Sequence, residues 1–284
     1  TGIIRNALPL DDGRFVIPNG QNLYFIDRKG GIERTLAPGQ GILTEPILLA
    51  DGNLLIGDRI TGLHWIDPRG NLIRTVKVDG GIEAPALELP NHRIAVGTMW
   101  GRVLVFERNG SRLSGTGEPD IRMVGPVESQ PILLPGGGFA VVHKHGRMFT
   151  FDANGRETGS FDPGQWMRPA PTLLRNGIFV VTLQDGTIAF VRQNGTVLKR
   201  VVDVPRGGSS RAIELEDGSV LVAHRGPRWK ITRLSSEGEI LGQQSAPDRD
   251  AELSPSTFRM LADTFEPDGS LRPGAIVFTE RPLM

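Results

Sequence analysis

Residues 46–78, PILLADGNLLIGDRITGLHWIDPRGNLIRTVKV, decide the fold of this chain. Three short apolar runs, PILL, LLIG and LHWI, are separated by the pair Asp51-Gly52 and by a loop at 58–62. The turn Asp67–Gly70 then leads into a fourth, less apolar run. Runs of four to six residues between such turns are too short for helices, and Asp-Gly pairs favour tight hairpins. The segment therefore predicts a four-stranded antiparallel sheet.

The same unit recurs along most of the chain. An apolar run, a polar residue, two variable residues and a glycine recur as FIDRKG, WIDPRG, VFERNG, TFDANG, FVRQNG and RLSSEG. The glycines that close these turns are Gly30, Gly70, Gly110, Gly155, Gly195 and Gly238. The third run of each unit is apolar on both faces, so each sheet must lie between two others. Four-stranded units that repeat every ~40–45 residues are typical of a β-propeller, an all-β fold.

The length of the chain sets the number of blades. A chain of 284 residues divided by a repeat of about 40 residues gives seven blades. We therefore predict a single seven-bladed β-propeller domain over residues 1–284. The segment Thr1–Arg5 belongs to no unit, and we expect it to complete the last blade and close the ring. The repeats are expected to start near residues 7, 46, 85, 131, 171, 211 and 255.

Composition excludes several classes of protein. Lys plus Arg and Asp plus Glu both number 32, which argues against nucleic acid as a partner. The absence of Cys excludes disulfides and thiolate sites. No apolar run approaches ~18 residues, so we expect no transmembrane segment. The chain begins at Thr1 and shows no signal peptide, which we interpret as a processed or trimmed product.

The repeat unit resembles those of quinoprotein-like (PQQ-repeat-like) propellers. The shared pattern is P-x-L-L-x-x-G-x-x-x-V followed by G-x-L-x-x-x-D-x-x-G, and it covers roughly Ala7 to Gly238. That superfamily holds quinone-dependent dehydrogenases and the scaffold lipoprotein of the outer-membrane assembly machinery. The dehydrogenase repeats end their outer strand in a Trp, whereas the corresponding segments here contain none. The resemblance therefore implies the scaffold branch, no quinone cofactor, and a periplasmic or secreted setting.

Candidate site residues follow from the propeller geometry. The loops between second and third strands, and the segments that lead into the first strands, are expected on one face around the axis. These segments collect polar and aromatic side chains. The candidate ligand-binding residues are Arg59, Trp100, Gln130, His143, His145, Trp166, Arg168, His224, Arg225, Trp229 and Glu280.

The histidines of this set have two interpretations. His143 and His145 are two residues apart at the end of a strand, which predicts that both rings point to one side. With His224 they could bind a metal ion or act as acid and base groups. They could equally be ordinary polar loop residues. The sequence leaves open whether any metal is bound.

The aromatic and cationic candidates are also ambiguous. Trp100 and Trp229 could stack on sugar rings or anchor a peptide, or could cover their own blades. Arg59, Arg168 and Arg225 could bind carboxylates, or could pair with neighbouring acidic residues such as Asp58.

The preferred functional hypothesis is a non-catalytic binding or scaffold module. It would engage a protein or peptide partner through the loop face, with no cofactor. The chain has no G-x-S-x-G, H-E-x-x-H or P-loop motif, which disfavours several enzyme classes. Two alternatives remain open. One is a lyase or hydrolase that acts on polysaccharide through His143, His145 and His224, and the other is a glycan-binding lectin.

Overall fold

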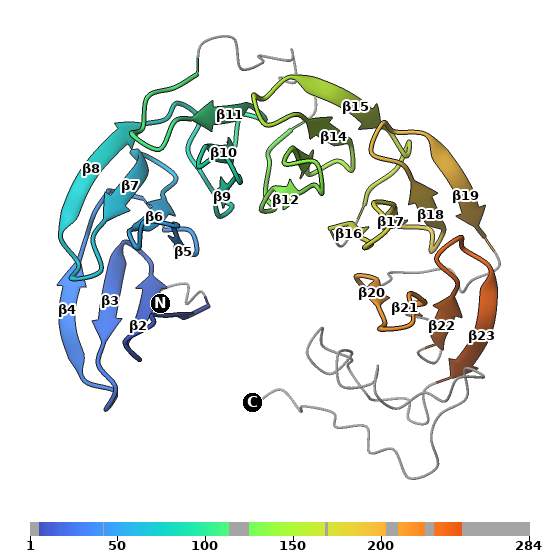
Figure 1. Cartoon of the computed structure of the whole chain (residues 1–284), viewed down its shortest axis with the longest axis horizontal. Helices are drawn as coiled ribbons and strands as arrows, with labels where there is room; N and C mark the ends of the chain where they lie inside the picture. Colours follow the sequence, from blue (N-terminus) through green and yellow to red (C-terminus); the bar gives the residue numbers. More distant parts are fainter. Residues whose placement is uncertain are drawn as a thin grey trace. The chain divides into compact units, whose positions relative to one another are not determined.

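The computed structural model describes residues 6–41, 43–113, 125–167, 170–202, 210–224 and 230–245. Every regular element within these ranges is a strand. The strands form five four-stranded sheets and one three-stranded sheet, all antiparallel and in chain order (Figure 1). The closing strand predicted at 1–5 and the seventh repeat predicted from 255 lie outside the described residues. The number of seven blades and the single domain stay predictions.

The chain divides into two compact units, Thr1–Gly159 and Ser160–Met284. Four sheets begin in the first unit. The first sheet contains β1 (Leu8–Pro9), β2 (Phe15–Asn19), β3 (Asn22–Ile26) and β4 (Ile32–Leu36). The second contains β5 (Ile47–Leu48), β6 (Leu54–Gly57), β7 (Gly62–Ile66) and β8 (Leu72–Lys77). The third contains β9 (Leu87–Glu88), β10 (Ile94–Gly97) and β11 (Val103–Phe106), and the fourth contains β12 (Ile132–Leu133), β13 (Phe139–Val142), β14 (Met148–Phe151) and β15 (Glu157–Phe161).

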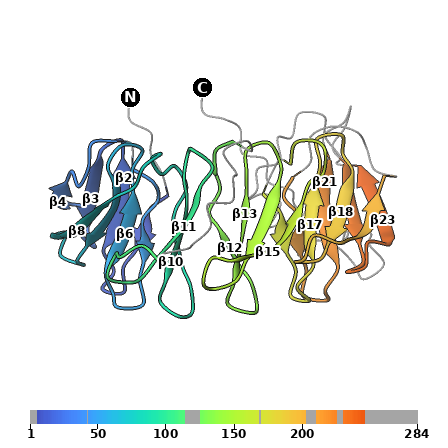
Figure 2. The same ribbon diagram turned by 90° about the horizontal axis from the view of Figure 1, so that it is seen from above.

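The second unit holds two further sheets of the same kind. The fifth sheet contains β16 (Thr172–Leu173), β17 (Phe179–Thr182), β18 (Ile188–Val191) and β19 (Val197–Val201). The sixth contains β20 (Ile213–Glu214), β21 (Val220–His224), β22 (Lys230–Leu234) and β23 (Ile240–Ser245). Within each unit the hairpin turns lie at two opposite ends of the strands (Figure 2). The predicted four-stranded sheets are thus confirmed within the described residues, except for the third. That sheet shows only a single bridge, Phe106 to Arg112, in place of its outer strand.

The sheets of the first unit are buried on both faces. Along β6, Leu54 and Ile56 pack into one core cluster with the first sheet, while Leu55 between them packs into another with the third sheet. Along β10, Ile94 and Val96 face the second sheet and Ala95 faces the fourth. Successive side chains of a strand point to opposite faces. The apolar runs without alternation are therefore explained by neighbouring sheets on both sides.

Long polar side chains of the outer strands contact the next sheet, where the dehydrogenase repeats carry Trp. A methyl group built on Gly70 would lie 2.8 Å from Cδ of Arg34, and one built on Gly110 would lie 3.3 Å from Cδ of Arg74. The Nη1 of Arg34 also donates to the carbonyl of Arg69 at 3.5 Å. The aliphatic stem of an Arg side chain can pack against a turn while its charged end stays in water. These stems contribute to the contact between adjacent sheets.

His92 is the exception among the turns that join the first two strands of each sheet. Its φ is +64°, whereas the equivalent residues of the other described sheets are glycines with φ of 80° to 83°. A side chain in this left-handed conformation clashes with its own backbone, and the clash costs about 1–2 kcal/mol. The ring of His92 contacts Oε1 of Glu88 at 3.2 Å but is 54% exposed.

We expect His92→Gly to raise the free energy of unfolding by about 1 kcal/mol, because it removes this strain and loses only an exposed contact. Urea denaturation measures the change. The matched control is Gly52→Ala in the equivalent turn, where φ is +83° and no atom lies within 4 Å of an added methyl group. That variant should lose stability through conformation alone. A less stable His92→Gly would show instead that the contact with Glu88 outweighs the strain.

Candidate functional site

The hairpins between second and third strands share one turn geometry in the second, third and fourth sheets. The N–H of Asp58 donates to the carbonyl of Gly62, that of Thr98 to Arg102, and that of His143 to Arg147, each at 2.9 Å. Arg59, Trp100 and His145 lie inside these turns. The three turns therefore present their central residues at the same end of their sheets.

The turns of the second and third sheets meet through two glycines. The carbonyl of Gly81 accepts the N–H of Met99 at 3.1 Å, and an added methyl group on Gly81 would overlap the backbone carbonyl of Arg59. One on Gly80 would lie 2.9 Å from Cγ of Trp100. The φ angles of Gly80 and Gly81 are +95° and +62°. Their conformation and the lack of space both favour glycine here.

These contacts produce a continuous surface that we call the Trp100 strip. It comprises Arg59, Ile60, Gly80 and Trp100, with Gly81 buried beneath it. Ile60 and Trp100 are each 60% exposed, which is unusual for such large apolar side chains. The side chain of Arg59 is 34% exposed and forms an ion pair with Glu83. Arg59 and Trp100 were predicted from the sequence as ligand-binding residues. Ile60 and the glycine pair were not, since glycines were considered only as turn residues.

The predicted histidine pair is not arranged as expected. The turn at 143–147 places His143 in the interior, 1% exposed, and His145 at the surface. The prediction that both rings point to one side assumed an extended strand, but a tight turn begins at His143 and breaks that alternation.

Residues 143–145 hold the segment that leads into the fourth sheet. The Nδ1–H of His143 donates to the carbonyl of Gly125 at 3.0 Å, and the N–H of Lys144 donates to the carbonyl of Pro126 at 2.9 Å. The ring of His145 lies against Gly125, 2.7 Å from the position of an added methyl group. The ammonium of Lys144 pairs with Glu128 at 2.6 Å. The segment 143–145 thus has a structural role in addition to any binding role.

His143 and His224 occupy the same repeat position, at the end of the second strand. Phe139 pairs with Leu133 in the fourth sheet, and Val220 pairs with Glu214 in the sixth. Each histidine lies four residues after that paired residue, so the two positions are equivalent. Both are buried, and His224 is 0% exposed. Burial lowers the pKa of His143, and burial with the nearby charge of Lys230 lowers the pKa of His224 to about 4. Both rings are therefore neutral at pH 7 and lie in the interior rather than at the ligand-accessible surface that we predicted.

Asp58, expected as a loop residue near Arg59, is fully buried. Its Oδ2 accepts a hydrogen bond from Nε2 of His64 at 2.9 Å. Its Oδ1 accepts hydrogen bonds from three backbone N–H groups, those of Ile60 at 2.7 Å, of Gly62 at 3.2 Å and of Thr61. Burial would raise the pKa of Asp58, but the hydrogen bonds from His64 and from the backbone outweigh burial, and its pKa lies below the ordinary value.

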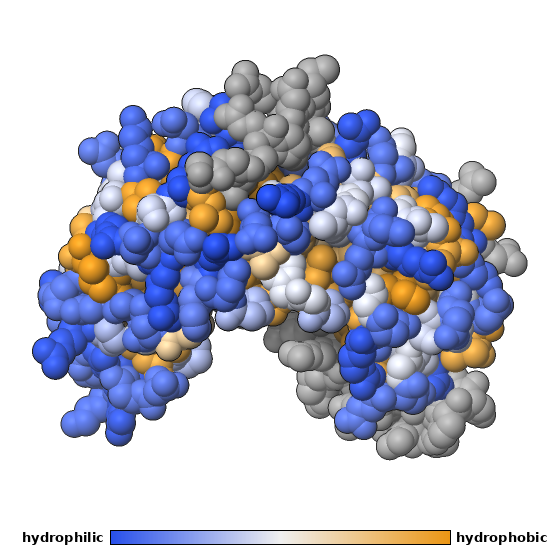
Figure 3. All heavy atoms as spheres, turned by 45° about the horizontal axis from the view of Figure 1, so that its top comes forward, coloured by the Kyte–Doolittle hydropathy of each residue, from blue (hydrophilic) through white to orange (hydrophobic). Residues whose placement is uncertain are grey.

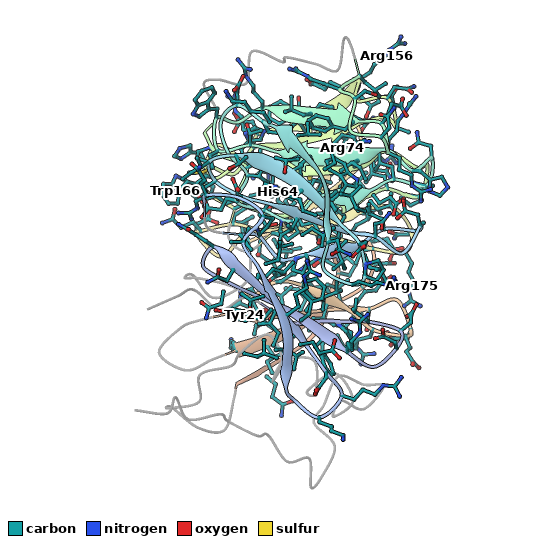
Figure 4. The ribbon with its side chains drawn as sticks, turned by 90° about the vertical axis from the view of Figure 1, so that its left-hand side faces the viewer. Tyr24, His64, Arg74, Arg156, Trp166 and Arg175 are labelled. Carbon is teal, nitrogen blue, oxygen red and sulfur yellow. The ribbon has the colours of Figure 1, made fainter. Side chains whose placement is uncertain are left out.

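A hydrogen-bonded chain therefore runs from Asp58 through His64, the residue labelled in Figure 4, to the outer strand of the second sheet. An ionised carboxylate only accepts hydrogen bonds, so Nε2 of His64 carries the proton and Nδ1 accepts from the hydroxyl of Thr75, 3.0 Å away. His64 is buried, as is Trp65 beside it. This arrangement fixes the turn that carries Arg59 and Ile60.

The remaining candidates are placed as follows. The side-chain amide of Gln130 donates to the carbonyl of Ala86 at 2.9 Å, so Gln130 joins two lead-in segments. In the second unit, Trp166 is 40% exposed and its carbonyl accepts the N–H of Gln184 at 3.1 Å. The candidates that lie outside the described residues are Arg168, Arg225, Trp229 and Glu280.

Neither a membrane-spanning helix nor a metal-binding group is present in the described ranges. None of their residues belongs to a helix long and apolar enough to cross a bilayer. No three His, Asp or Glu side chains there lie close enough to share a metal ion.

Comparison with solved structures identifies the architecture. BamB from Moraxella catarrhalis, an outer-membrane assembly lipoprotein, is 15% identical with a TM-score of 0.66, over 87% of this chain and 76% of that one. A catalytically inactive virginiamycin B lyase from Staphylococcus aureus is 16% identical with a TM-score of 0.58, over 87% and 84%. The C-terminal WD40 domain of Sif2 is 12% identical with a TM-score of 0.62, over 87% and 73%. No family model and no curated protein matches the chain.

These likenesses confirm the β-propeller fold that the repeat and its resemblance to quinoprotein-like propellers predicted. At such low identity they establish the fold alone.

Proposed function

We propose that this protein is a non-catalytic binding module that engages a protein or peptide partner through its loop face, with the Trp100 strip as the point of contact. The observation that supports the proposal is the 60% exposure of both Ile60 and Trp100 beside the Arg59–Glu83 ion pair. Trp and Arg are among the residues enriched at the centres of protein interfaces, and the exposed Ile60 adds apolar area beside them.

The strip is also held in place before any partner binds. One side of the Trp100 side chain rests on Gly80, and the turn that carries Arg59 and Ile60 is held by Asp58. Binding to a rigid surface loses little conformational entropy, so more of the contact energy becomes affinity. We include Trp166, Arg168, Arg225, Trp229 and Glu280 in the proposed binding face on the basis of their place in the repeat. The proposed setting is the periplasm or the exterior of the cell, without a cofactor.

The enzyme alternative receives no support from the described residues. His143 and His224 are buried, and the Nδ1 of His143 is bonded to the carbonyl of Gly125. A general acid or base must reach the proton that it transfers, directly or through one water. A surface aromatic residue serves a carbohydrate as well as a peptide, and the test below separates the two.

Photocrosslinking tests the proposed contact. A benzophenone amino acid replaces Trp100 in cells that make the protein, and a second variant carries it at Leu241, which is 49% exposed on β23. We expect a crosslinked protein from position 100 and none from position 241. Binding of that partner to the purified protein should weaken at least tenfold in Trp100→Ala, as expected when an aromatic anchor of an interface is removed. An unchanged affinity of Trp100→Ala, or crosslinks from position 241 alone, would refute the proposal.

A further inference from the structure

The outer strands of the sheets carry a second surface. Among the described residues, strands β4, β8, β15, β19 and β23 are each hydrogen-bonded to one neighbouring strand only. Several begin with exposed aliphatic residues, and space-filling shows apolar side chains at the surface among hydrophilic ones (Figure 3). The most exposed of these in the first unit are Ile32 at 62%, Ile73 at 52% and Leu72 at 43%. An exposed strand edge is a surface to which another strand can add.

Strand β8 carries more unpaired positive charge than the other outer strands of the described residues. Its sequence, LIRTVK, contains Arg74 and Lys77 and no acidic residue. Neither cation forms an ion pair with a described residue, whereas Lys199 on β19 pairs with Glu239. On β4, Glu33 is paired with Arg14 at 3.4 Å.

The acidic residue nearest in sequence to the start of β8 is already engaged. Asp67 accepts the N–H groups of Arg69 and Asn71 at 2.9 and 2.8 Å. These bonds, which outweigh its burial, place the pKa of Asp67 below its ordinary value, so the carboxylate is fixed within its own turn. Strand β8 therefore has unneutralised positive charge along an open edge.

The backbone of β8 is also available. Five of its six residues, all but Ile73, pair with β7, and the main-chain groups of β8 form no hydrogen bond to any described residue on the other side. The side chains alternate between the two faces of the sheet. Thr75 bonds to His64, while Arg74 and Val76 both pack near Gly110 of the next sheet. The register shifts at the start of β8, where Ile73 lies between the partners of Trp65 and Ile66 and has none of its own, so the alternation of faces is interrupted at Leu72 and Ile73.

We propose that the open edge of β8 binds an extended acidic segment of a partner protein, which adds to the second sheet as a further strand. Main-chain hydrogen bonds would supply the pairing, and acidic side chains of the segment would pair with Arg74 and Lys77. A second copy of β8 does not fit, because two such edges would bring like charges together. A flat anionic bilayer fits less well, because it offers no main-chain groups to pair with the open edge. The proposal is independent of the Trp100 strip.

Peptide binding tests this inference on the full chain. The probe is a synthetic ten-residue peptide in which Glu alternates with Val and Thr, and the matched probe has Lys in place of Glu. Arg74→Gln with Lys77→Gln removes both charges and keeps the side-chain stems, including the one near Gly110. We expect the Glu peptide to bind wild type and to lose about tenfold in affinity in the double variant, as two partly exposed ion pairs disappear. The control variant is Arg200→Gln on β19, which should bind as wild type does.

Two further measurements separate strand addition from charge attraction. Hydrogen exchange should show protection of β8 amides by the Glu peptide. A Glu peptide N-methylated at alternate residues keeps its charge but cannot form one row of main-chain hydrogen bonds, and its binding should be lost.

The charge pairing has a test of its own, in which the charge-reversed variant Arg74→Glu with Lys77→Glu should prefer the Lys peptide. Equal binding of the N-methylated peptide, no loss in the glutamine variant, or charge-dependent binding to phosphatidylglycerol vesicles without peptide binding would each overturn the proposal.

Discussion

Gly39→Ala is expected to lower the free energy of unfolding by about 3 kcal/mol, because it breaks a fully buried hydrogen bond to an ionised carboxylate. A methyl group at this position would overlap Oδ2 of Asp58 and lie 2.6 Å from Nε2 of His64. Both side chains are 0% exposed, and Asp58 also holds the backbone of its turn. The added carbon must therefore displace one partner and leave the other buried without it.

Urea denaturation of Gly39→Ala and of Gly136→Ala isolates this effect. Gly136 has no atom within 4 Å of an added methyl group and no left-handed φ, so its variant should differ from wild type by less than about 0.5 kcal/mol. In an Asp58→Ala background, Gly39→Ala should lower the free energy of unfolding by much less, since the overlapping oxygen is gone. A wild-type stability for Gly39→Ala would show that the Asp58–His64 pair moves without cost.

Acidification is expected to destabilise the protein through His224, by up to about 3 kcal/mol. Burial, with a smaller contribution from Lys230, lowers the folded-state pKa of His224 from 6.5 to about 4. Between these pH values the unfolded chain binds more protons than the folded one. The stabilisation is therefore complete above pH 6.5, is lost as the pH falls, and changes no further below about pH 4. The buried His143, with its lowered pKa, acts in the same direction.

The residue at the equivalent position of another sheet suggests a variant that tests this expectation. In the fifth sheet the equivalent position is Leu183, which is fully buried. His224→Leu should therefore be accepted by the fold, and the loss of unfolding free energy between pH 7 and pH 4 should shrink by about 3 kcal/mol. His145→Gln, at an exposed site, should lose as much unfolding free energy between pH 7 and pH 4 as the wild type does. An unchanged pH profile in His224→Leu would mean that His224 is protonated in the folded protein.

The fold was predictable because its evidence is local and repeated. Each unit carries its own turn residues, and a sheet buried on both faces requires apolar residues without alternation, as in Leu54 and Leu55. Six copies of one pattern make the interpretation robust against an exception such as His92. The outer strand expected in the third sheet is the exception, since its described residues show only the bridge to Arg112.

The candidate site was predictable only in part. The repeat placed Arg59 and Trp100 on adjacent turns, and the structure joins them through Gly80 and Gly81. The burial of His143 was missed, although aligning the repeats offered a signal. The same position holds Leu183 in another sheet, which indicates an interior site.

The amino-acid sequence by itself determined the repeat, the strands, the turns and hence the propeller fold, because these depend on hydrophobic patterning and on glycine conformation within a few residues. The tertiary structure alone decided which polar side chains are buried and which are exposed. That outcome depends on contacts between segments far apart in the chain, such as Gly39 with Asp58 or Gly81 with Met99. A histidine in a turn looks the same in a sequence whether it faces water or the carbonyl of Gly125. Only packing distinguishes the buried His143 from the exposed Trp100.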